Sequence, residues 1–376
     1  MTSPSPRDLN RAAVMDLAMR HANLTRNNAV EMSGLSKATI SRVVDELLAD
    51  GMLVEGGDNQ TIGRGRPSRF LTAAPELGMV IGVDMGITTT RMLVADLNGT
   101  VLATVKRPTR NGLRARAHGQ WLAKQIAGSA RQAAMPHAPL LQTTVSVPGK
   151  IDSTGQIART AMPQLADHDL RGQLARELGC DVRLENDANM ALRGEMTDGA
   201  AVGCPNVGMF VVSTALSAAV AIDRAILKGN RAVLGDIGRL PFEGTRCLSD
   251  VLSVSGIEHA AAANGHAIQL DELVAEPAGH PAVAKIRDDF TEGMALAISA
   301  MLLVVDPDLI VFNGRLLPLL EQLLDPITER VTSIVPAVPP LQLSQADGFS
   351  GTRGALTVAL EQARKLIRER TLDRAS

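Results

Sequence analysis

Residues 25–51 read TRNNAVEMSGLSKATISRVVDELLADG, and this stretch predicts two helices joined by a tight turn. Thr25 and Ser36 can each cap a helix N-terminus, because a hydroxyl oxygen accepts a hydrogen bond from a backbone N–H of the first turn. Gly34 can adopt the left-handed backbone that ends a helix. After Ser36 the apolar residues recur at the spacing of an amphipathic helix. They are Ile40, Val43, Val44, Leu47 and Leu48.

The face opposite this apolar stripe carries short polar and basic side chains. Base edges are read by hydrogen bonds and phosphates are held by charge, so such a face is what a recognition helix requires. A solvated helix face of no further function would look similar, and the helix alone does not separate the two. The candidate DNA contacts on this helix are Ser36, Lys37, Thr39, Ser41 and Arg42.

Two short segments, Met52-Leu53-Val54 and Arg69-Phe70-Leu71, predict a strand pair around a tip rich in glycine and arginine. The tip contains GRGRP at 63–67, which resembles an AT-hook core and supplies Arg64 and Arg66 as further candidate DNA contacts. Arginines favour a narrow groove, where the negative potential of DNA is strongest. An ordinary solvated loop is the alternative for this segment. With an amphipathic helix expected at 7–21, residues 1–73 are predicted to form a winged helix-turn-helix that is mainly α.

The rest of the chain is expected to form an α/β body with two lobes. With 376 residues the chain exceeds what one hydrophobic core usually sustains. A linker with Pro75 is expected at 74–78. Apolar runs separated by turns follow it, and a similar series begins near residue 207. We therefore expect a body over 79–376, with one lobe at 79–190 plus the C-terminal helix and the other at 191–355.

Charge and cysteine content exclude some classes of protein. A net charge of −2 argues against a chain that coats nucleic acid with its whole surface, although a small basic module remains compatible with it. Cys180, Cys204 and Cys247 form no CxxC pair, which favours a reducing compartment. The N-terminus does not resemble a secretory signal, and the longest uncharged apolar stretch, 207–222, is too short to span a bilayer. We expect a cytoplasmic protein with no membrane partner.

The order of motifs resembles that of the ROK family (repressors, open reading frames, kinases) over nearly the whole chain. LENDAN at 184–189 is the most specific of these motifs. The resemblance implies a two-lobed α/β body of the actin/hexokinase-like, ribonuclease H-like class. The other motifs are GLSKATIS at 34–41, GRGRPS at 63–68, IGVDMGITTT at 81–90, VSVPGKID at 145–152, GDIGRL at 235–240, NGRL at 313–316 and GALTVAL at 354–360.

The resemblance also implies a site for a sugar. In kinases of the family, the residue that matches Asp187 takes the proton from the sugar hydroxyl, and the residue that matches Asn186 hydrogen-bonds the sugar. A structural alternative exists, because Asn and Asp at the start of a helix are good caps. Asp236 stands where the family has Glu, Arg239 replaces a His that contacts the sugar, and Ser249 replaces a Glu. The candidate effector-binding residues are Gly149, Asn186, Asp187, Asp236 and Arg239.

Departures from the family pattern argue against kinase activity. Phosphate loops are rich in glycine because backbone amides must approach the nucleotide closely. Ile87 stands where the family's first loop has its second glycine, and the second loop, STALSAA at 213–219, contains none. We expect no enzyme activity, no cofactor and only a vestigial role for Asp187. A zinc site is not expected either, since only Cys247 resembles a member of the family's cysteine cluster, and we expect Cys247 to be an ordinary small core residue.

These expectations combine into a DNA-binding transcriptional regulator, expected to be a repressor of carbohydrate-metabolism genes. It would bind a double-stranded operator as a homodimer or homotetramer and sense a sugar or sugar derivative. Arg239 would favour an anionic effector such as a sugar acid or sugar phosphate, because a guanidinium suits carboxylate and phosphate geometry. The alternative is that Arg239 only pairs with Asp236 and the site is vestigial. Two other readings stay open, an active sugar kinase with an accessory DNA module and an effector-independent regulator.

Overall fold

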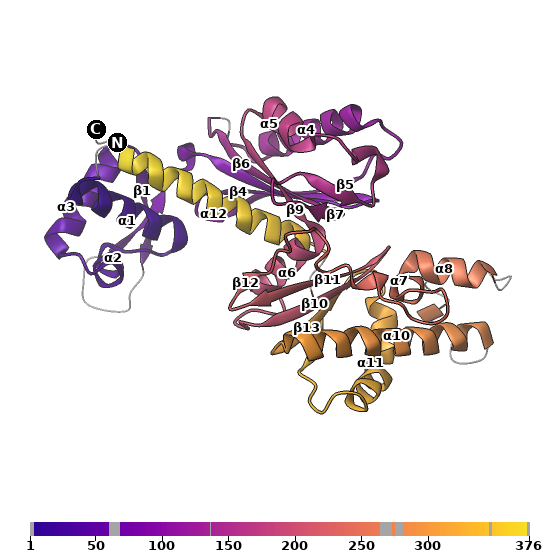
Figure 1. Ribbon diagram of the computed structural model, residues 1–376. Helices are drawn as coiled ribbons and strands as arrows, with labels where there is room; N and C mark the ends of the chain where they lie inside the picture. The colour runs from indigo at the N-terminus through magenta and orange to yellow at the C-terminus, as the bar shows by residue number, and fades with distance from the viewer. Residues whose placement is uncertain are drawn as a thin grey trace. The chain divides into compact units, whose positions relative to one another are not determined.

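The structure is a computed structural model that describes residues 4–59, 68–135, 137–263, 273–274, 281–345 and 348–373 (Figure 1). The chain divides into two compact units. Unit 1 comprises residues 1–145, 162–184 and 355–376, and unit 2 comprises residues 146–161 and 185–354. The limits expected from the sequence for the linker and for each lobe stay predictions.

The N-terminal part of unit 1 consists of three helices and a two-stranded antiparallel sheet, which confirms the helix pair and the strand pair predicted from the sequence. The apolar stripe of the third helix is buried, including Ile40, Val43 and Leu47. The elements are α1 (Pro6–Arg20), α2 (Arg26–Ser33), α3 (Lys37–Ala49), β1 (Leu53–Asn59) and β2 (Ser68–Ala73).

The helix ends lie where the cap residues predicted them. The Thr25 side chain accepts a hydrogen bond from the Asn28 amide and the Asn28 side chain from the Thr25 amide, which closes a capping box before α2. Gly34 follows α2 with φ +69°, a left-handed conformation that costs glycine little. The Ser36 hydroxyl then accepts a hydrogen bond from the Thr39 amide at 3.1 Å. Local side-chain chemistry therefore sets both helix starts and the turn between them.

Two five-stranded sheets form the α/β body, and they share one strand order. The first runs β5-β4-β3-β6-β9 and the second β12-β11-β10-β13-β14, so each has an antiparallel three-stranded meander with two later strands added beside its first strand. The predicted pair of related lobes is confirmed. The strands of the first sheet are β3 (Met79–Met85), β4 (Thr89–Asp96), β5 (Val101–Pro108), β6 (Leu140–Val147) and β9 (Asp181–Asn186), and those of the second are β10 (Val207–Val212), β11 (Leu216–Ile222), β12 (Ala225–Ile226), β13 (Leu309–Asn313) and β14 (Leu341–Leu343).

Helices cover the sheets. In the first lobe α4 packs on β3, β4 and β5, and α5 packs beside α4. In the second lobe β13 alternates between two apolar clusters, with Phe312 facing one and Val311 the other, so both sheet faces are buried. The helices are α4 (Ala115–Gln132), α5 (Leu170–Leu178), α6 (Asp187–Asp198), α7 (Leu248–Val251), α8 (Val254–Ala263), α10 (Pro281–Val305) and α11 (Leu317–Thr332), with short 3₁₀ turns η1 (Pro75–Leu77), η2 (Pro163–Leu165) and η3 (Ile237–Arg239).

The last helix, α12 (Ser350–Asp373), contributes residues to both units. Its first turns cross α6 closely, because a Cβ on Gly354 would collide with the Met190 carbonyl oxygen and a Cβ on Gly194 with the Ser350 carbonyl oxygen. Beside this crossing the fully buried Glu195 carboxylate accepts hydrogen bonds from the hydroxyls of Ser344 and Ser350. Within unit 1, the Arg364 guanidinium donates to the Leu97 carbonyl at 3.0 Å. In the part of the chain that the structure describes, no helix is long and apolar enough to cross a membrane.

Candidate functional site

The exposed face of α3 carries the side chains that the sequence analysis predicted to contact DNA. Ser36, Lys37, Ser41 and Arg42 are exposed, and Thr39 is half-buried. The Thr39 hydroxyl lies 2.9 Å from the Ser36 hydroxyl, so these two groups serve first to begin the helix. Within the described residues, the side chains of Lys37 and Arg42 make neither an ion pair nor a hydrogen bond. They are the cations of α3 that are available to a phosphate or a base edge.

Arg26 of α2, which the sequence analysis did not propose as a functional residue, supports the exposed face of α3. Its guanidinium pairs with Asp45 of α3 at 2.8 Å and with Glu55 of β1 at 3.0 Å, and it approaches the Ser41 hydroxyl at 3.4 Å. Partial burial opposes its charge, but the hydrogen bonds to Glu55 and Asp45 outweigh this and raise the pKa of Arg26. Arg26 therefore fixes α3 against α2 and β1. No short-range pattern marks such a role, because its partners lie 19 and 29 residues away.

The predicted wing is described only at its base. Arg64 and Arg66 lie outside the described residues, so their candidate roles stay predictions. At the base, Arg69 is exposed and its guanidinium lies 3.5 Å from the Glu55 carboxylate. Leu71 of β2 forms a bridge with Leu24, which ties the strand pair to the segment before α2.

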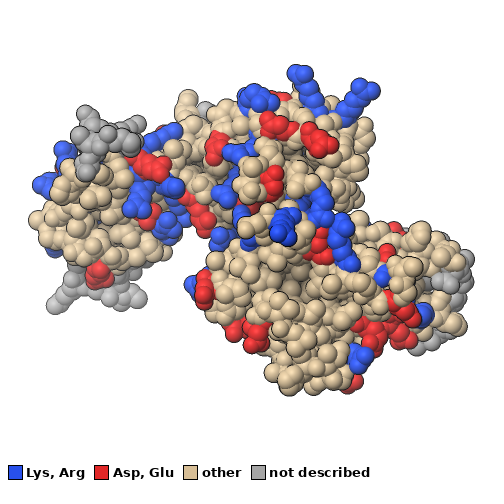
Figure 2. Space-filling view, in the orientation of Figure 1, with Lys and Arg blue, Asp and Glu red and all other residues tan. Residues whose placement is uncertain are grey.

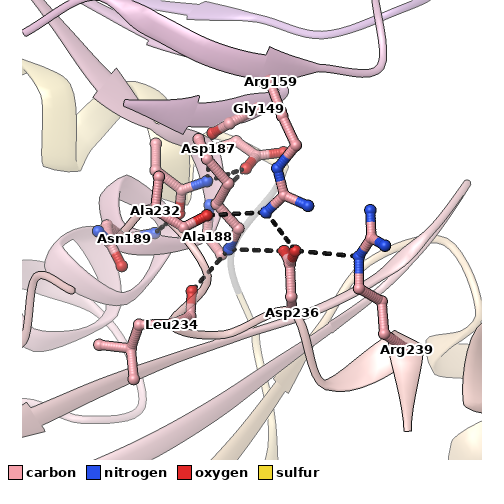
Figure 3. Close-up of polar contacts among 11 residues, drawn as sticks. Gly149, Arg159, Asp187, Ala188, Asn189, Ala232, Leu234, Asp236 and Arg239 are labelled. Atoms are coloured by element: carbon pink, nitrogen blue, oxygen red, sulfur yellow. Dashed lines mark hydrogen bonds and ion pairs between the residues drawn. The ribbon is translucent and has the colours of Figure 1, made fainter. Parts of the chain in front are cut away.

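The candidate effector residues of unit 2 gather around a small hairpin of β7 (Gly149–Ile151) and β8 (Ile157–Thr160). A Cβ on Gly149 would collide with the Arg159 carbonyl oxygen, so the close pairing requires glycine. The Gly149 carbonyl accepts a hydrogen bond from the Asn186 side-chain amide at 2.6 Å. Figure 3 shows Gly149 and Asp187 lying close together. The structure thus brings together Gly149, Asn186 and Asp187 by direct contact.

Asn186 works largely as a structural residue. Its carbonyl oxygen caps α6 by accepting from the Asn189 amide at 3.0 Å. Its NH₂ group donates to the Gly149 carbonyl and, at 2.9 Å, to the Asp187 carboxylate. A carboxamide has two N–H donors, and both are used here. Asn186 can therefore offer a ligand only a remaining lone pair, and the cap alternative weighed from the sequence describes much of its role. Asp187 is half-buried, and the same carboxylate oxygen accepts from the Ala188 amide.

Asp236 lies among three cations. Its carboxylate oxygens are 3.4 Å from Lys150 Nζ, 2.5 Å from Arg159 Nη2 and 3.3 Å from Arg239 Nε. Figure 3 shows Asp236 between the guanidinium groups of Arg159 and Arg239. Lys150 is mostly buried, whereas the Arg239 side chain is 74% exposed. One carboxylate cannot neutralise three cations, so the cluster formed by Asp236 and these three side chains carries an excess of positive charge.

The hairpin cations also hold the loop that leads to Asp236. Lys150 Nζ donates to the Leu234 carbonyl at 2.9 Å, and Arg159 Nη2 donates to the Ala232 carbonyl at 2.7 Å. Gly235 has φ +80°, and a Cβ there would meet the Ala218 carbonyl oxygen. Lys150 and Arg159 were missed by the sequence reasoning, since Asp236 lies 86 and 77 residues after them. The nearest sequence signal was the motif VSVPGKID at 145–152, which contains Gly149 and Lys150 but not Arg159.

The segments that correspond to phosphate loops are short, closed turns. In unit 1, the turn from β3 to β4 has its carbonyls bonded, with Thr109 Oγ1 donating to Gly86 O at 2.7 Å and Asn111 Nδ2 to Ile87 O at 3.0 Å. In unit 2, only three residues join β10 to β11, and the Leu216 side chain is buried in the core. The Ser255 hydroxyl donates to the Thr214 carbonyl in this turn at 2.6 Å. Neither turn offers the open run of glycine amides that a triphosphate needs.

Cys247 differs from the sequence expectation of a small core residue. It is half-buried and begins α7, where its backbone amide donates to the Asp250 carboxylate at 2.7 Å. Ser249, in the same helix, lies against η3, because a Cβ on Gly238 would collide with its hydroxyl. In the described ranges, no group of three or more His, Cys, Asp or Glu side chains is arranged to hold a metal ion.

Comparison with known proteins defines the class. The model of the ROK family matches residues 80–362, and the chain belongs to the ROK family. Among curated proteins, it is 26% identical over 246 residues to the xylose repressor of Bacillus subtilis (strain 168), with 64% of this chain and 62% of the repressor covered. It is also 26% identical over 287 residues to the glucokinase of Thermotoga maritima, covering 68% of this chain and 88% of the glucokinase. The chain thus spans less than two thirds of the repressor's length.

Solved structures give the same fold. A ROK family transcriptional regulator, described as a homolog of the E. coli MLC protein, matches 98% of this chain and 99% of its own with a TM-score of 0.74 at 19% identity. The ROK hexokinase of Thermus thermophilus matches 76% of this chain and 99% of its own with a TM-score of 0.66 at 24% identity. The actin/hexokinase-like body predicted from the sequence is confirmed, and the N-terminal helices fit a helix-turn-helix.

Proposed function

We propose that the protein is a DNA-binding transcriptional regulator, acting as a repressor of carbohydrate-metabolism genes, whose sugar-kinase-like body binds an effector and transfers no phosphate. The observation that carries the proposal is α3. It begins at a capped turn after α2, buries its apolar stripe and presents Lys37 and Arg42 without intramolecular partners among the described residues. Basic side chains left unpaired on one face of the second helix of such a pair suit a major groove.

The extent of the structural matches supports this proposal. The regulator matches 98% of the chain, whereas the hexokinase matches 76%. The difference corresponds in size to the N-terminal module, which a sugar kinase does not need. The xylose repressor among the relatives supports the same function.

The two turns that replace phosphate loops are the reason to propose a body without kinase activity. The Gly86 amide donates to the Thr89 carbonyl at 3.0 Å, and the Ser213 amide donates to the Ala215 carbonyl at 3.3 Å, so these N–H groups are already used within the turns. Leu216 also fills core space in the second turn. A specific observation favours the alternative of an active kinase, namely the retained Asn186–Asp187 pair. The use of both Asn186 N–H donors inside the protein argues against it.

Two assays on the full chain test the proposal. Duplexes recovered from the genome of the source organism by binding to the purified protein, then measured by fluorescence anisotropy, should bind more tightly than duplexes of shuffled sequence. A coupled assay for ADP release with MgATP and glucose, xylose or N-acetylglucosamine should give no signal above a protein-free control. Equal binding to shuffled duplexes, or sugar-dependent ADP release, would contradict the proposal.

We further infer that the effector is an anionic sugar derivative. Asp236 pairs with Arg239, which is the alternative considered from the sequence, but Lys150 and Arg159 join the same carboxylate. An anionic ligand would take over part of this excess positive charge, whereas a neutral sugar would have to compete with three cations for Asp236. A bidentate guanidinium contact with a carboxylate or phosphate is also stronger than a neutral hydrogen bond.

Thermal unfolding with added ligands tests this inference. Glucuronate and glucose 6-phosphate should raise the unfolding midpoint at concentrations where glucose and xylose do not, because a ligand that binds the folded state stabilises it by mass action. The variant Arg159→Gln/Arg239→Gln should lose this shift, and Arg224→Gln, an exposed arginine of the same unit, should keep it. Equal shifts from neutral sugars would refute an anionic effector. Unchanged DNA affinity with a ligand that does bind would identify an effector-independent regulator.

A further inference from the structure

A long segment of the first lobe carries positive charge without any carboxylate. No Asp or Glu occurs from Leu97 to Val145. We call residues 97–145 the basic segment. It spans β5, α4 and most of β6, so it is part of the folded lobe and not a tail. Its seven cations are Lys106, Arg107, Arg110, Arg114, Arg116, Lys124 and Arg131.

These seven side chains are exposed, and within the described residues none of them forms an ion pair. The N-terminal module differs. There, in the part that the structure describes, only Lys37 and Arg42 lack an ion pair, whereas Arg7, Arg11, Arg20, Arg26 and Arg69 all pair with nearby carboxylates. An exposed ion pair contributes little field at a distance, whereas unpaired cations add their potentials. The basic segment is therefore a stronger attractor of anions than the described part of the DNA-reading module.

Formal charges point the same way. Unit 1 holds 25 Lys and Arg against 18 Asp and Glu, a charge of +7, and unit 2 holds 13 against 22, a charge of −9. Residues 1–73 account for only +1 of the positive unit, with nine cations and eight carboxylates. Most of the excess lies in the first lobe. Figure 2 shows Lys and Arg side chains projecting from the part of the surface where Figure 1 draws α4 and α5, with some Asp and Glu side chains beside them.

The cations of α4 form a line. Arg116, Lys124 and Arg131 are 8 and 15 residues apart, which places them within about 80° of one another around a helix of 3.6 residues per turn. The opposite side of the helix is buried and includes Leu122 and Ile126. At 1.5 Å per residue the line is about 22 Å long. A single small anion cannot span that length, but a linear polyanion can.

The connection before α4 carries further cations on a backbone that hydrogen bonds hold in place. The Thr109 amide donates to the Thr88 carbonyl at 2.9 Å, and Asn111 Nδ2 donates to the Ile87 carbonyl at 3.0 Å. These bonds pin the backbone beside Arg110 and just before Arg114. Lys106 and Arg107 lie on β5, which is the edge strand of its sheet. An ordered set of cations loses less entropy on binding than a flexible tail would.

We propose that the basic segment binds the phosphate backbone of duplex DNA flanking the operator, as a second DNA contact besides α3. The proposal rests on the proposed function, which already brings duplex DNA to this chain. Duplex DNA carries one negative charge per about 1.7 Å of axis, so a line of cations about 22 Å long can neutralise several phosphates. The contact would add affinity and carry no sequence information.

The test compares two duplexes that contain the same operator, one of about 20 base pairs and one extended to about 60. Two variants are measured with the wild type. In the first, Arg110, Arg116, Lys124 and Arg131 are each changed to Gln. In the matched control, Arg224, Lys285, Arg315 and Arg330 of unit 2 are each changed to Gln, which removes the same charge from exposed positions elsewhere. Unchanged thermal midpoints check that the variants fold.

We expect the wild type and the control to bind the long duplex more tightly than the short one, and the first variant to bind both alike. The slope of log affinity against log salt on the long duplex should fall by about 0.9 for each phosphate that the first variant no longer neutralises. A first variant that keeps the wild-type preference for the long duplex, or a wild type without that preference, would overturn the proposal. Failure of the wild type to recognise the short operator would instead contradict the proposed function.

Discussion

The two units share a strand order and differ in charge. Both sheets place an antiparallel meander beside two later strands, yet unit 1 carries +7 and unit 2 carries −9. Strand order follows from apolar residues that face a core, whereas surface charge is free to diverge. Under the proposals above, the positive unit 1 contacts DNA, and the effector binds unit 2. The positive group around Asp236 is then a local exception within an acidic unit.

The largest expected effect concerns the apolar core of unit 2. Phe312 is fully buried and stacks on Phe210, with ring centroids 5.9 Å apart. Phe312→Ala should lower the free energy of unfolding by about 3–5 kcal/mol, because it removes apolar contacts and leaves a cavity. Urea unfolding measures this decrease. Leu303→Ala, at a position that is 69% exposed, is the control and should change stability by no more than about 0.5 kcal/mol.

The next prediction compares two cations of α3 that have no ion pair with a cation of unit 1 that has one. Lys37→Ala/Arg42→Ala should weaken operator binding by about 2–4 kcal/mol, if each side chain contributes within the usual range of a specific contact. Stability should not change, since neither side chain has a partner in the described residues. Arg20→Ala removes a cation that pairs with Asp16 at 2.9 Å. The Arg20→Ala variant should keep an operator affinity within about twofold of the wild type. If Arg20→Ala weakened operator binding as much as Lys37→Ala/Arg42→Ala does, the loss of affinity would not depend on where the cation lies.

A smaller effect distinguishes the cap role of Ser36 from a role in DNA contact. Ser36→Ala should cost about 1 kcal/mol of stability, because the Thr39 amide loses its acceptor. Ser36→Asp keeps an acceptor and should retain stability, but its negative charge faces DNA and should reduce affinity. Thermal unfolding and anisotropy on both variants give the two readouts. Normal operator affinity in Ser36→Asp would place this residue away from the phosphates.

The smallest expected effect is a pH dependence in unit 1. His118 of α4 is fully buried, and burial lowers its pKa. The unfolded chain, with an ordinary pKa of about 6.5, then binds the proton more readily than the folded chain, so stability should fall as the pH drops below that value. His118→Leu should flatten the dependence between about pH 7 and pH 5, while the exposed His259→Leu should not. A wild-type protein that becomes more stable on acidification across this pH range would contradict a lowered pKa of His118.

Features set by neighbouring residues could be predicted from the sequence, and features set by distant contacts could not. Thr25, Gly34 and Ser36 act within four residues, so the helix pair was predictable in detail. The ion pairs of Lys150 and Arg159 with Asp236 join segments about 80 residues apart, and nothing local encodes them. The buried Glu195 was missed for the same reason, since its partners Ser344 and Ser350 lie about 150 residues away.

Within the candidate site, sequence reasoning found the residue positions better than their roles. Gly149, Asn186 and Asp187 do lie together, but the structure commits the Asn186 amide to the fold. A motif records which residue types are present and not how their hydrogen bonds are used. The roles of Arg64 and Arg66 in a wing stay predictions, because those residues lie outside the described ranges.

The central claim is that the N-terminal module attached to this ROK body recognises specific DNA sequences. The most direct test is genome-wide mapping of DNA bound by the full chain in its source organism, run in parallel with the Lys37→Ala/Arg42→Ala variant. The account predicts a small number of discrete sites, near genes of carbohydrate metabolism, that disappear in the variant. A uniform distribution without enriched sites, or the same sites in both proteins, would contradict it.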